Sequence, residues 1–477
     1  MTQTIGYLRK RHATEIDDSP WGLHYVVRQP SGPYPHDKLI DLMGRSGAKW
    51  SRFILRWPFV ESEKGVYDWS LFDTAVEGLS AQGVNLFIGS SASSNRLYHD
   101  YPEGYWYPPV GSADAMAGYL RYMETMVERY RDRVRHFEVW NEPNIKNFWR
   151  PEPDAADYAY LVRETAAAMR AVDPDLQVIG GVLAGVGEAQ SAFARDFLSD
   201  GDTAEAVDVL TYHPYNPTPE VTLGDIRALR ERVHAVKPEM PLWQGECGCP
   251  SSGDTIHYRG NPPWGYNVQA KWLLRRLLTD YLADAEVAIY FLIAEFYRHR
   301  VNGDPTSPMG FNTKGLIQGD TWQPKPAYYA FQNLASVIDI TWQRVDEEAV
   351  LEIVDPGIFF GIGPHEERFP CVPWQIALRR QAVPMLITWL PWQPQELVEP
   401  GTVRVHWPGV SWTQPVCVDL LTGAVMEVGV EGGAVEMPLA EYPMLLTELT
   451  ALDMMDQPQQ PAYQEIVAKL RWTYETT

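Results

Sequence analysis

Between residues 21 and 338 the chain alternates short apolar or β-branched runs with longer amphipathic stretches, and eight such units can be counted. This alternation favours a parallel sheet whose consecutive strands are connected by helices. Eight units predict an α/β fold, the closed (β/α)8 or TIM barrel, because an open doubly wound sheet normally has fewer strands and a glycine-rich phosphate turn. No GxGxxG or P-loop pattern follows any expected strand.

The expected elements follow from these runs. Strands are expected at 22–25, 50–55, 85–89, 136–140, 178–181, 207–212, 242–245 and 287–293. Helices are expected at 37–44, 71–81, 113–130, 158–171, 223–235, 268–282 and 327–338.

After residue 341 the sequence changes to turn residues and short runs at 385–390, 403–406, 416–420 and 444–448. This pattern of short apolar runs separated by turn residues predicts an antiparallel β-sandwich. We therefore expect an N-terminal segment at 1–20, the barrel at 21–338, a β-sandwich accessory domain at 339–452 and a C-terminal tail at 453–477, helical over 463–474. For the sandwich, bracing of the barrel is favoured over glycan binding.

The charge and cysteine content limit the partners and sites that this chain is expected to have. The chain has 62 Asp and Glu against 40 Lys and Arg, a formal charge of −22. Such a surface repels polyphosphates and anionic lipids, so neither nucleic acid nor membrane is an expected partner. The polar first twenty residues lack the apolar run of a signal peptide, which predicts a cytoplasmic protein as written, or a secreted one if a signal was removed. The four cysteines lack zinc-site spacing and are expected as free thiols.

Two glutamates end expected strands. Glu142 follows the fourth strand in an Asn-Glu-Pro sequence, and Glu246 follows the seventh between glycine and cysteine. These strands face each other across the mouth of a barrel, where such folds build their active sites. Retaining glycosidases need a protonated carboxyl and an ionised carboxylate roughly 5 to 5.5 Å apart, so the pair predicts hydrolysis of glycosidic bonds. The alternative is that each glutamate only caps the helix that follows it.

With these residues the chain resembles the clan A glycoside hydrolases, retaining barrel enzymes with an Asn-Glu pair after the fourth strand. The segments 140–144, 148–154, 57–69 and 325–330 look most like glycoside hydrolase family 39. The resemblance covers most of residues 21–338. It implies that Glu142 is the acid/base and Glu246 the nucleophile, with no metal or organic cofactor.

The resemblance also implies supporting residues. Asn141 would hold the sugar hydroxyl next to the anomeric carbon, because an amide both donates and accepts. Arg52 would keep the nucleophile ionised; Arg56 is the competing choice, and a plain surface ion pair is the alternative for Arg52. His213 and Tyr215 end the sixth strand like the clan's His-x-Tyr, with Tyr215 donating to the nucleophile and a structural role as the alternative for His213.

Further candidates come from the loops. The aromatic loop 98–109, with Trp106, predicts a sugar-stacking platform, and a loop pinned by packed rings is the alternative. Glu295, just beyond the eighth strand, would contact a sugar hydroxyl or pair with Arg298. Neutral and uronic sugars both stay open, because a carboxylate clamp is available from Arg96, Arg298, His299 and Arg300.

The favoured function is a retaining β-glycosidase that cleaves oligosaccharides, of the β-xylosidase or β-glucosidase type, with an oligosaccharide or polysaccharide as its partner. The enzymatic alternative is an endo-acting exopolysaccharide hydrolase of the same clan. A non-catalytic carbohydrate-binding protein on this scaffold is disfavoured because binding alone does not require both glutamates. A metal-dependent hydrolase is disfavoured because the 11 histidines show no HxxxH pair. The oligomeric state stays open.

Overall fold

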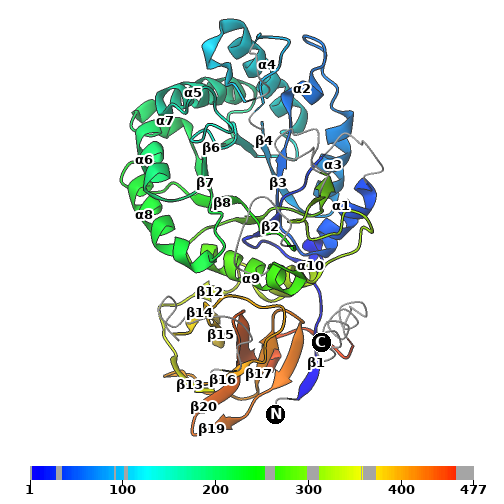
Figure 1. Cartoon of the computed structure of the whole chain (residues 1–477), viewed down its shortest axis with the longest axis vertical. Coiled ribbons are helices and arrows are strands. Elements are labelled where there is room, and N and C mark those ends of the chain that lie inside the picture. Colours follow the sequence, from blue (N-terminus) through cyan, green and yellow to red (C-terminus); the bar gives the residue numbers. More distant parts are fainter. Residues whose placement is uncertain are drawn as a thin grey trace.

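The computed structural model describes residues 3–27, 35–90, 93–100, 106–252, 264–297, 311–355, 357 and 372–457. Figure 1 shows a barrel ringed by helices next to a smaller β-domain. Among these residues, no helix combines the length and apolar character needed to cross a lipid bilayer.

The barrel is closed by eight parallel strands in chain order. All eight expected strands are therefore confirmed. The strands are β2 (Trp21–Leu23), β3 (Trp50–Ile54), β4 (Asn85–Gly89), β5 (His136–Glu138), β6 (Gln177–Ala184), β7 (Val209–His213), β8 (Leu242–Cys247) and β9 (Ala288–Tyr290).

Seven of the surrounding helices lie where the sequence predicts them: α1 (His36–Arg45), α3 (Ser70–Ala81), α4 (Ala113–Tyr130), α5 (Ala155–Val172), α8 (Leu223–His234), α9 (Tyr266–Leu282) and α10 (Pro326–Val337). Side-chain caps start two of them, since Ser112 caps α4 and Asp154 caps α5. The structure adds α2 (Trp57–Val60), α6 (Glu188–Phe197) and α7 (Gly201–Ala206). Helix α6 escapes sequence reasoning because it buries mainly small side chains, Ser191 and Ala194 beside Phe197.

The β-domain is an antiparallel sandwich of an eight-stranded and a four-stranded sheet. The first has the order β12-β14-β15-β21-β17-β18-β1-β22, and the second the order β13-β16-β20-β19. Their bounds are β1 (Thr4–Leu8), β12 (Gln343–Arg344), β13 (Val350–Asp355), β14 (Trp374–Arg380), β15 (Val383–Trp389), β16 (Gly401–His406), β17 (Pro415–Asp419), β18 (Ala424–Glu427), β19 (Val430–Glu431), β20 (Ala434–Leu439), β21 (Met444–Glu448) and β22 (Met454–Met455).

The two ends of the described chain differ from the expected division. Strand β1 comes from the expected separate N-terminal segment, yet it pairs inside the sandwich with β18 and β22. Strand β22 lies in the expected C-terminal tail, and the helix expected at 463–474 lies outside the described residues. The described residues therefore contribute β1 to the sandwich, then form the barrel and return to the sandwich.

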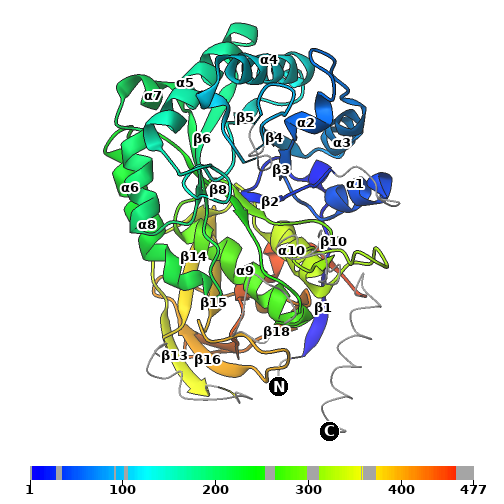
Figure 2. The same ribbon diagram turned by 45° about the horizontal axis from the view of Figure 1, so that its top comes forward.

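The sandwich packs against α9 and α10 of the barrel (Figure 2). Lys271 on α9 donates to Glu441 at 2.6 Å, and both side chains are almost fully buried. Arg275, one turn further along α9, binds Glu220, which also accepts from the indole of Trp389 in the sandwich. Buried charges thus connect the two parts.

Candidate active site

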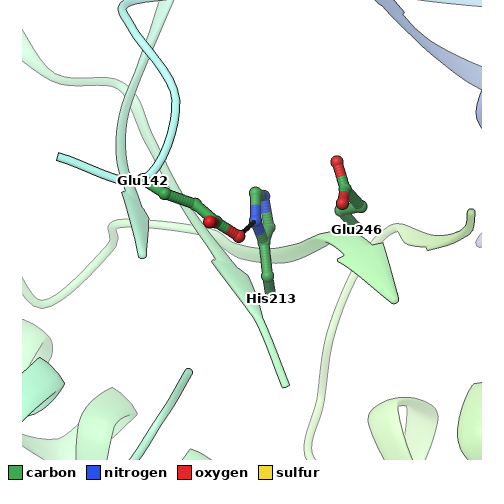
Figure 3. Close-up of side chains that lie close together, drawn as sticks. All are labelled: Glu142, His213 and Glu246. Atoms are coloured by element: carbon green, nitrogen blue, oxygen red, sulfur yellow. Dashed lines mark hydrogen bonds and ion pairs between the residues drawn. The ribbon is translucent and has the colours of Figure 1, made fainter. Parts of the chain in front are cut away.

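Glu142 and Glu246 lie at the carboxyl ends of two strands that β6 and β7 separate in the barrel, and the side chain of His213 lies between the two glutamates (Figure 3). Glu246 is part of β8, and Glu142 follows β5. The chain reaches Glu142 through a sharp turn, in which Trp140 and Glu142 have φ angles of 67° and 50°. Such angles cost energy in residues other than glycine and concentrate at functional sites.

Neither glutamate caps a helix, which excludes the capping alternative. The side-chain cap of α5 is Asp154, and at the start of α9 the backbone N–H groups of Asn267 and Val268 donate to Glu396. One carboxylate oxygen of Glu142 and one of Glu246 lie within 4.8 Å of each other. This is close to the separation of roughly 5 to 5.5 Å that double displacement requires.

Glu142 lies in an environment that favours its protonated form. Its residue is 8% exposed, and burial raises the pKa of its carboxyl to about 7, against the opposing charge of Arg52. Its Oε1 lies 2.9 Å from Nδ1 of His213. Burial and then Arg52 lower the pKa of His213 to about 4, so this imidazole is neutral at neutral pH. A neutral imidazole serves a carboxyl in either protonation state, according to its tautomer.

Glu246, unlike Glu142, has a cation and a phenol hydroxyl as partners of its two oxygens. Tyr215 donates its hydroxyl to Oε1 at 2.8 Å, and Arg52 donates from Nη1 to Oε2 at 2.5 Å. His24 lies further away, with Nδ1 3.9 Å from Oε2. Both oxygens of Glu246 therefore have charged or hydroxyl partners, which Glu142 lacks. Two carboxyl groups in such different surroundings suit the two roles of an acid and a nucleophile.

Arg52 lies on β3 and is fully buried. Burial disfavours its charge, but Glu138 and Glu246 outweigh burial and raise its pKa. It also donates from Nη2 to Oδ1 of Asn141 at 2.7 Å. Arg52 is therefore no surface ion pair, and Arg56 is exposed with its guanidinium over Phe59 instead.

Sequence reasoning missed two residues of this site, Glu138 and His24. Both are buried, at 0% and 2% exposure. The signal for Glu138 was a charged residue inside the apolar run of 136–140, at a position whose neighbours are phenylalanine and valine. His24 follows a three-residue strand and carries no comparable sequence signal.

Part of the aromatic loop 98–109 is packed in the protein interior. Tyr98 is 6% exposed, stacks on Trp57 with ring centroids 5.1 Å apart and donates to Glu61. For Tyr98 the packed-ring alternative therefore holds. Trp106 is half-buried and meets Phe148 edge-on at 5.6 Å. Its role in sugar stacking stays a prediction, and residues 101–105 lie outside the described part.

Glu295 is bound by Lys325, and its expected partner, Arg298, lies outside the described residues. Lys325 donates to Oε1 at 2.7 Å, and the backbone N–H of Gly319 donates to Oε2 at 3.1 Å. A sugar contact of Glu295 stays a prediction. Of the expected carboxylate clamp, Arg96 is exposed, whereas residues 298–300 lie outside the described residues.

Glu142, His213 and Glu246 present three possible metal ligands within 4.8 Å of one another. The guanidinium of Arg52 lies against Glu246 and would repel a divalent cation at that position. The arrangement therefore suits acid–base and nucleophilic chemistry better than metal binding.

The part of the chain that carries Glu142 and His213 is similar to a known protein family. Residues 65–237 match the model of the glycosyl hydrolases family 39, a segment that includes Glu142 and His213. A β-xylosidase of Geobacillus stearothermophilus is 30% identical over 164 residues, which are 32% of this chain and 31% of that protein. The aligned part thus spans about a third of that relative. The resemblance predicted from the sequence is confirmed.

Solved structures agree in fold. A family 39 glycoside hydrolase of Bacteroides cellulosilyticus WH2 aligns with a TM-score of 0.67 and 20% identity, covering 90% of this chain and 81% of that one. A β-xylosidase of Caulobacter crescentus aligns with a TM-score of 0.56 and 20% identity, covering 94% and 98%. These likenesses support a barrel joined to a β-sandwich.

Proposed function

We propose that this chain, a family 39-like glycoside hydrolase, is a retaining β-glycosidase that removes sugars from oligosaccharides, with β-xylosides as its first candidate substrates. The observation that carries the proposal is the pair Glu142 and Glu246, whose oxygens lie within 4.8 Å in opposite electrostatic surroundings. The β-xylosidase of Geobacillus stearothermophilus that matches part of the chain supports the choice of xylosides.

In the first step, Glu246 attacks the anomeric carbon while Glu142 gives its proton to the leaving oxygen. The bond from Oε of Glu246 to the carbon forms as the glycosidic bond breaks, and the aglycone leaves as an alcohol. Burial keeps Glu142 protonated to about pH 7. Arg52 and Tyr215 orient the attacking carboxylate through their hydrogen bonds to it.

In the second step, Glu142 is ionised and takes a proton from water, whose oxygen attacks the anomeric carbon. The ester bond to Glu246 breaks, and the sugar leaves with its original configuration. His213, 2.9 Å from Oε1 of Glu142, donates to the ionised carboxylate in this step. Two displacements at one carbon give net retention.

Asn141 is oriented for a role beside the reacting carbon. Its Oδ1 accepts from Arg52, which fixes the amide plane. The amino group is then directed by the same contact and is available to donate to the neighbouring sugar hydroxyl. Hydrogen bonds to this hydroxyl contribute to the stabilisation of the transition state.

The test is intact-protein mass after incubation with 2-deoxy-2-fluoro xylosides and glucosides that carry a good leaving group. We expect a covalent adduct on the wild type, mapped to the peptide that contains Glu246, and none on Glu246→Gln. Glu142→Gln is expected to accumulate the adduct, because the second step lacks its base. Glu396→Gln, a change of a half-buried carboxylate that caps α9, serves as the control with wild-type labelling.

The sugar that labels the protein identifies the substrate class. If no sugar labels the wild type and none is hydrolysed, the proposal fails and the carbohydrate-binding alternative takes its place. Labelling of Glu246→Gln at another carboxylate would contradict the assignment of the nucleophile.

A further inference from the structure

A second carboxylate shares Arg52 with Glu246. Glu138 on β5 is fully buried and has no part in the two steps above. Nε of Arg52 lies 3.2 Å from both of its oxygens, and Nη2 lies 2.5 Å from Oε1. One side of the guanidinium is therefore clamped by Glu138, and the remaining Nη1 is directed at Glu246.

The barrel is built to accommodate this clamp. Gly89 on β4 pairs with Glu138 in the sheet register. A Cβ atom at residue 89 would lie 2.7 Å from Oε1 of Glu138, which is closer than such atoms approach in proteins. The glycine leaves the space that the carboxylate occupies, so the position of Glu138 is fixed by packing as well as by charge.

We propose that Glu138 is a positioning residue, which fixes the guanidinium of Arg52 and shares its charge so that Arg52 orients Glu246 without ionising Glu142. The proposal rests on the proposed function. It assigns Glu138 an electrostatic task in addition to the hydrogen bonds that hold the arginine in place.

The charges around Glu142 show why a shared Arg52 matters. Arg52, His213 and Glu246 face Glu142 from β3, β7 and β8. His213 and His24 are neutral, because burial lowers the pKa of each. Burial likewise raises the pKa of Tyr119 and Tyr158, the phenols near Glu138, which keeps them neutral.

Arg52 is thus the only cation among these facing groups, with two carboxylates bound to it. It already opposes the burial that raises the pKa of Glu142. If Glu138 were neutral, the charge of Arg52 would be less balanced, and its attraction for an ionised Glu142 would grow. Glu142 would then lose its proton at a lower pH and be a poorer acid at neutral pH.

The experiment compares Glu138→Gln with Glu220→Gln in kcat/KM against pH on an activated and an unactivated glycoside. Glu220 is the matched control, because it is an equally buried carboxylate in a bidentate pair with Arg275, away from the site. We expect Glu138→Gln to move the basic limb to lower pH by about one unit, with about a fivefold loss at pH 7 on the unactivated substrate. Glu220→Gln is expected to lower Tm and leave the limb in place.

The variant Glu138→Asp tests the position of the carboxylate separately from its charge. It keeps the charge but draws the carboxylate away from Arg52, so we expect the wild-type basic limb with a lower kcat. If Glu138→Gln keeps the wild-type limb, or moves it as Glu220→Gln does, the proposal is overturned. If the Gln variant does not fold, the Asp variant decides, and a wild-type kcat overturns the positioning role.

Failure of the proposed function is distinguished by assaying the wild type first. If the wild type hydrolyses no glycoside, Glu138 is tested without substrate. Tm is measured against pH for the wild type and for Glu138→Gln, each as a pair of proteins with and without the further change Glu142→Gln. The difference between the members of a pair reports the titration of Glu142. We expect this titration at lower pH in the Glu138→Gln background, and an unchanged titration would overturn the inference.

Discussion

Nδ1 of His213 lies 2.9 Å from Oε1 of Glu142, so the proposed proton donor has a neutral imidazole as its direct partner. A cation at this position would ionise Glu142 and remove the proton that the first step needs. A neutral donor instead supports the ionised form only through a single hydrogen bond. This pairing allows one carboxyl group to act as an acid and then as a base.

Replacement of His213 by phenylalanine tests this pairing. The ring volume is retained, but the hydrogen bond to the ionised Glu142 is lost, so the charged form becomes less stable. We therefore expect the basic limb of kcat/KM against pH to move to higher pH, with roughly a tenfold lower kcat from the weakened second step. A limb that moves to lower pH would show that His213 supports the protonated carboxyl instead.

The raised pKa of Glu142 also predicts a pH-dependent stability. Its carboxyl titrates at about 7 in the folded chain against an ordinary value of 4.5. The folded state therefore binds the proton more tightly, and this stabilisation is complete below pH 4.5 and is lost as the pH rises through 7. The loss amounts to roughly 3 kcal/mol.

Glu142→Gln has no such titration. Its free energy of unfolding, measured in urea between pH 4.5 and 8, is expected to rise relative to the wild type as the pH increases. The gain should be complete above pH 7. Parallel curves for the two proteins would mean that burial does not raise the pKa of Glu142.

The repeated strand–helix units of the barrel could be predicted from the sequence alone. Eight apolar runs predict eight strands, and the positions of Glu142 and Glu246 then follow from the geometry of a barrel. Strand β1 was missed because a five-residue strand near the N-terminus carries no local sign of pairing with β18, more than 400 residues away. Glu138 was missed because its partner Arg52 lies two strands away, and only the folded barrel brings the two together.

The buried cysteines of the barrel and of the sandwich give a prediction on thiol reactivity. Cys247, Cys249 and Cys417 are free and buried, and burial raises the pKa of each thiol. The reactive thiolate is therefore scarce at neutral pH. In a Cys371→Ala background, which removes the cysteine outside the described residues, we expect no reaction with an aromatic disulfide reagent in the native state and three thiols in urea. Native labelling with loss of activity would contradict this burial.

The contact between Lys271 on α9 and Glu441 in the sandwich tests whether the sandwich braces the barrel. Both groups are almost fully buried, so Glu441→Ala leaves a buried ammonium without its partner. Breaking such a pair typically costs about 3 to 5 kcal/mol. We expect a single, cooperative thermal transition at a clearly lower Tm, since the two parts unfold together.

Glu436→Ala is the matched control, because its partner Arg404 pairs with it on the exposed face of the sandwich. Exposed pairs contribute about 0 to 1 kcal/mol, so this variant should unfold close to the wild-type Tm. Removal of the sandwich strands, including β1, is expected to give an insoluble barrel, because the buried charges on α9 would lose their partners. A soluble barrel with full activity would refute the bracing role and leave glycan binding as the reason for the second domain.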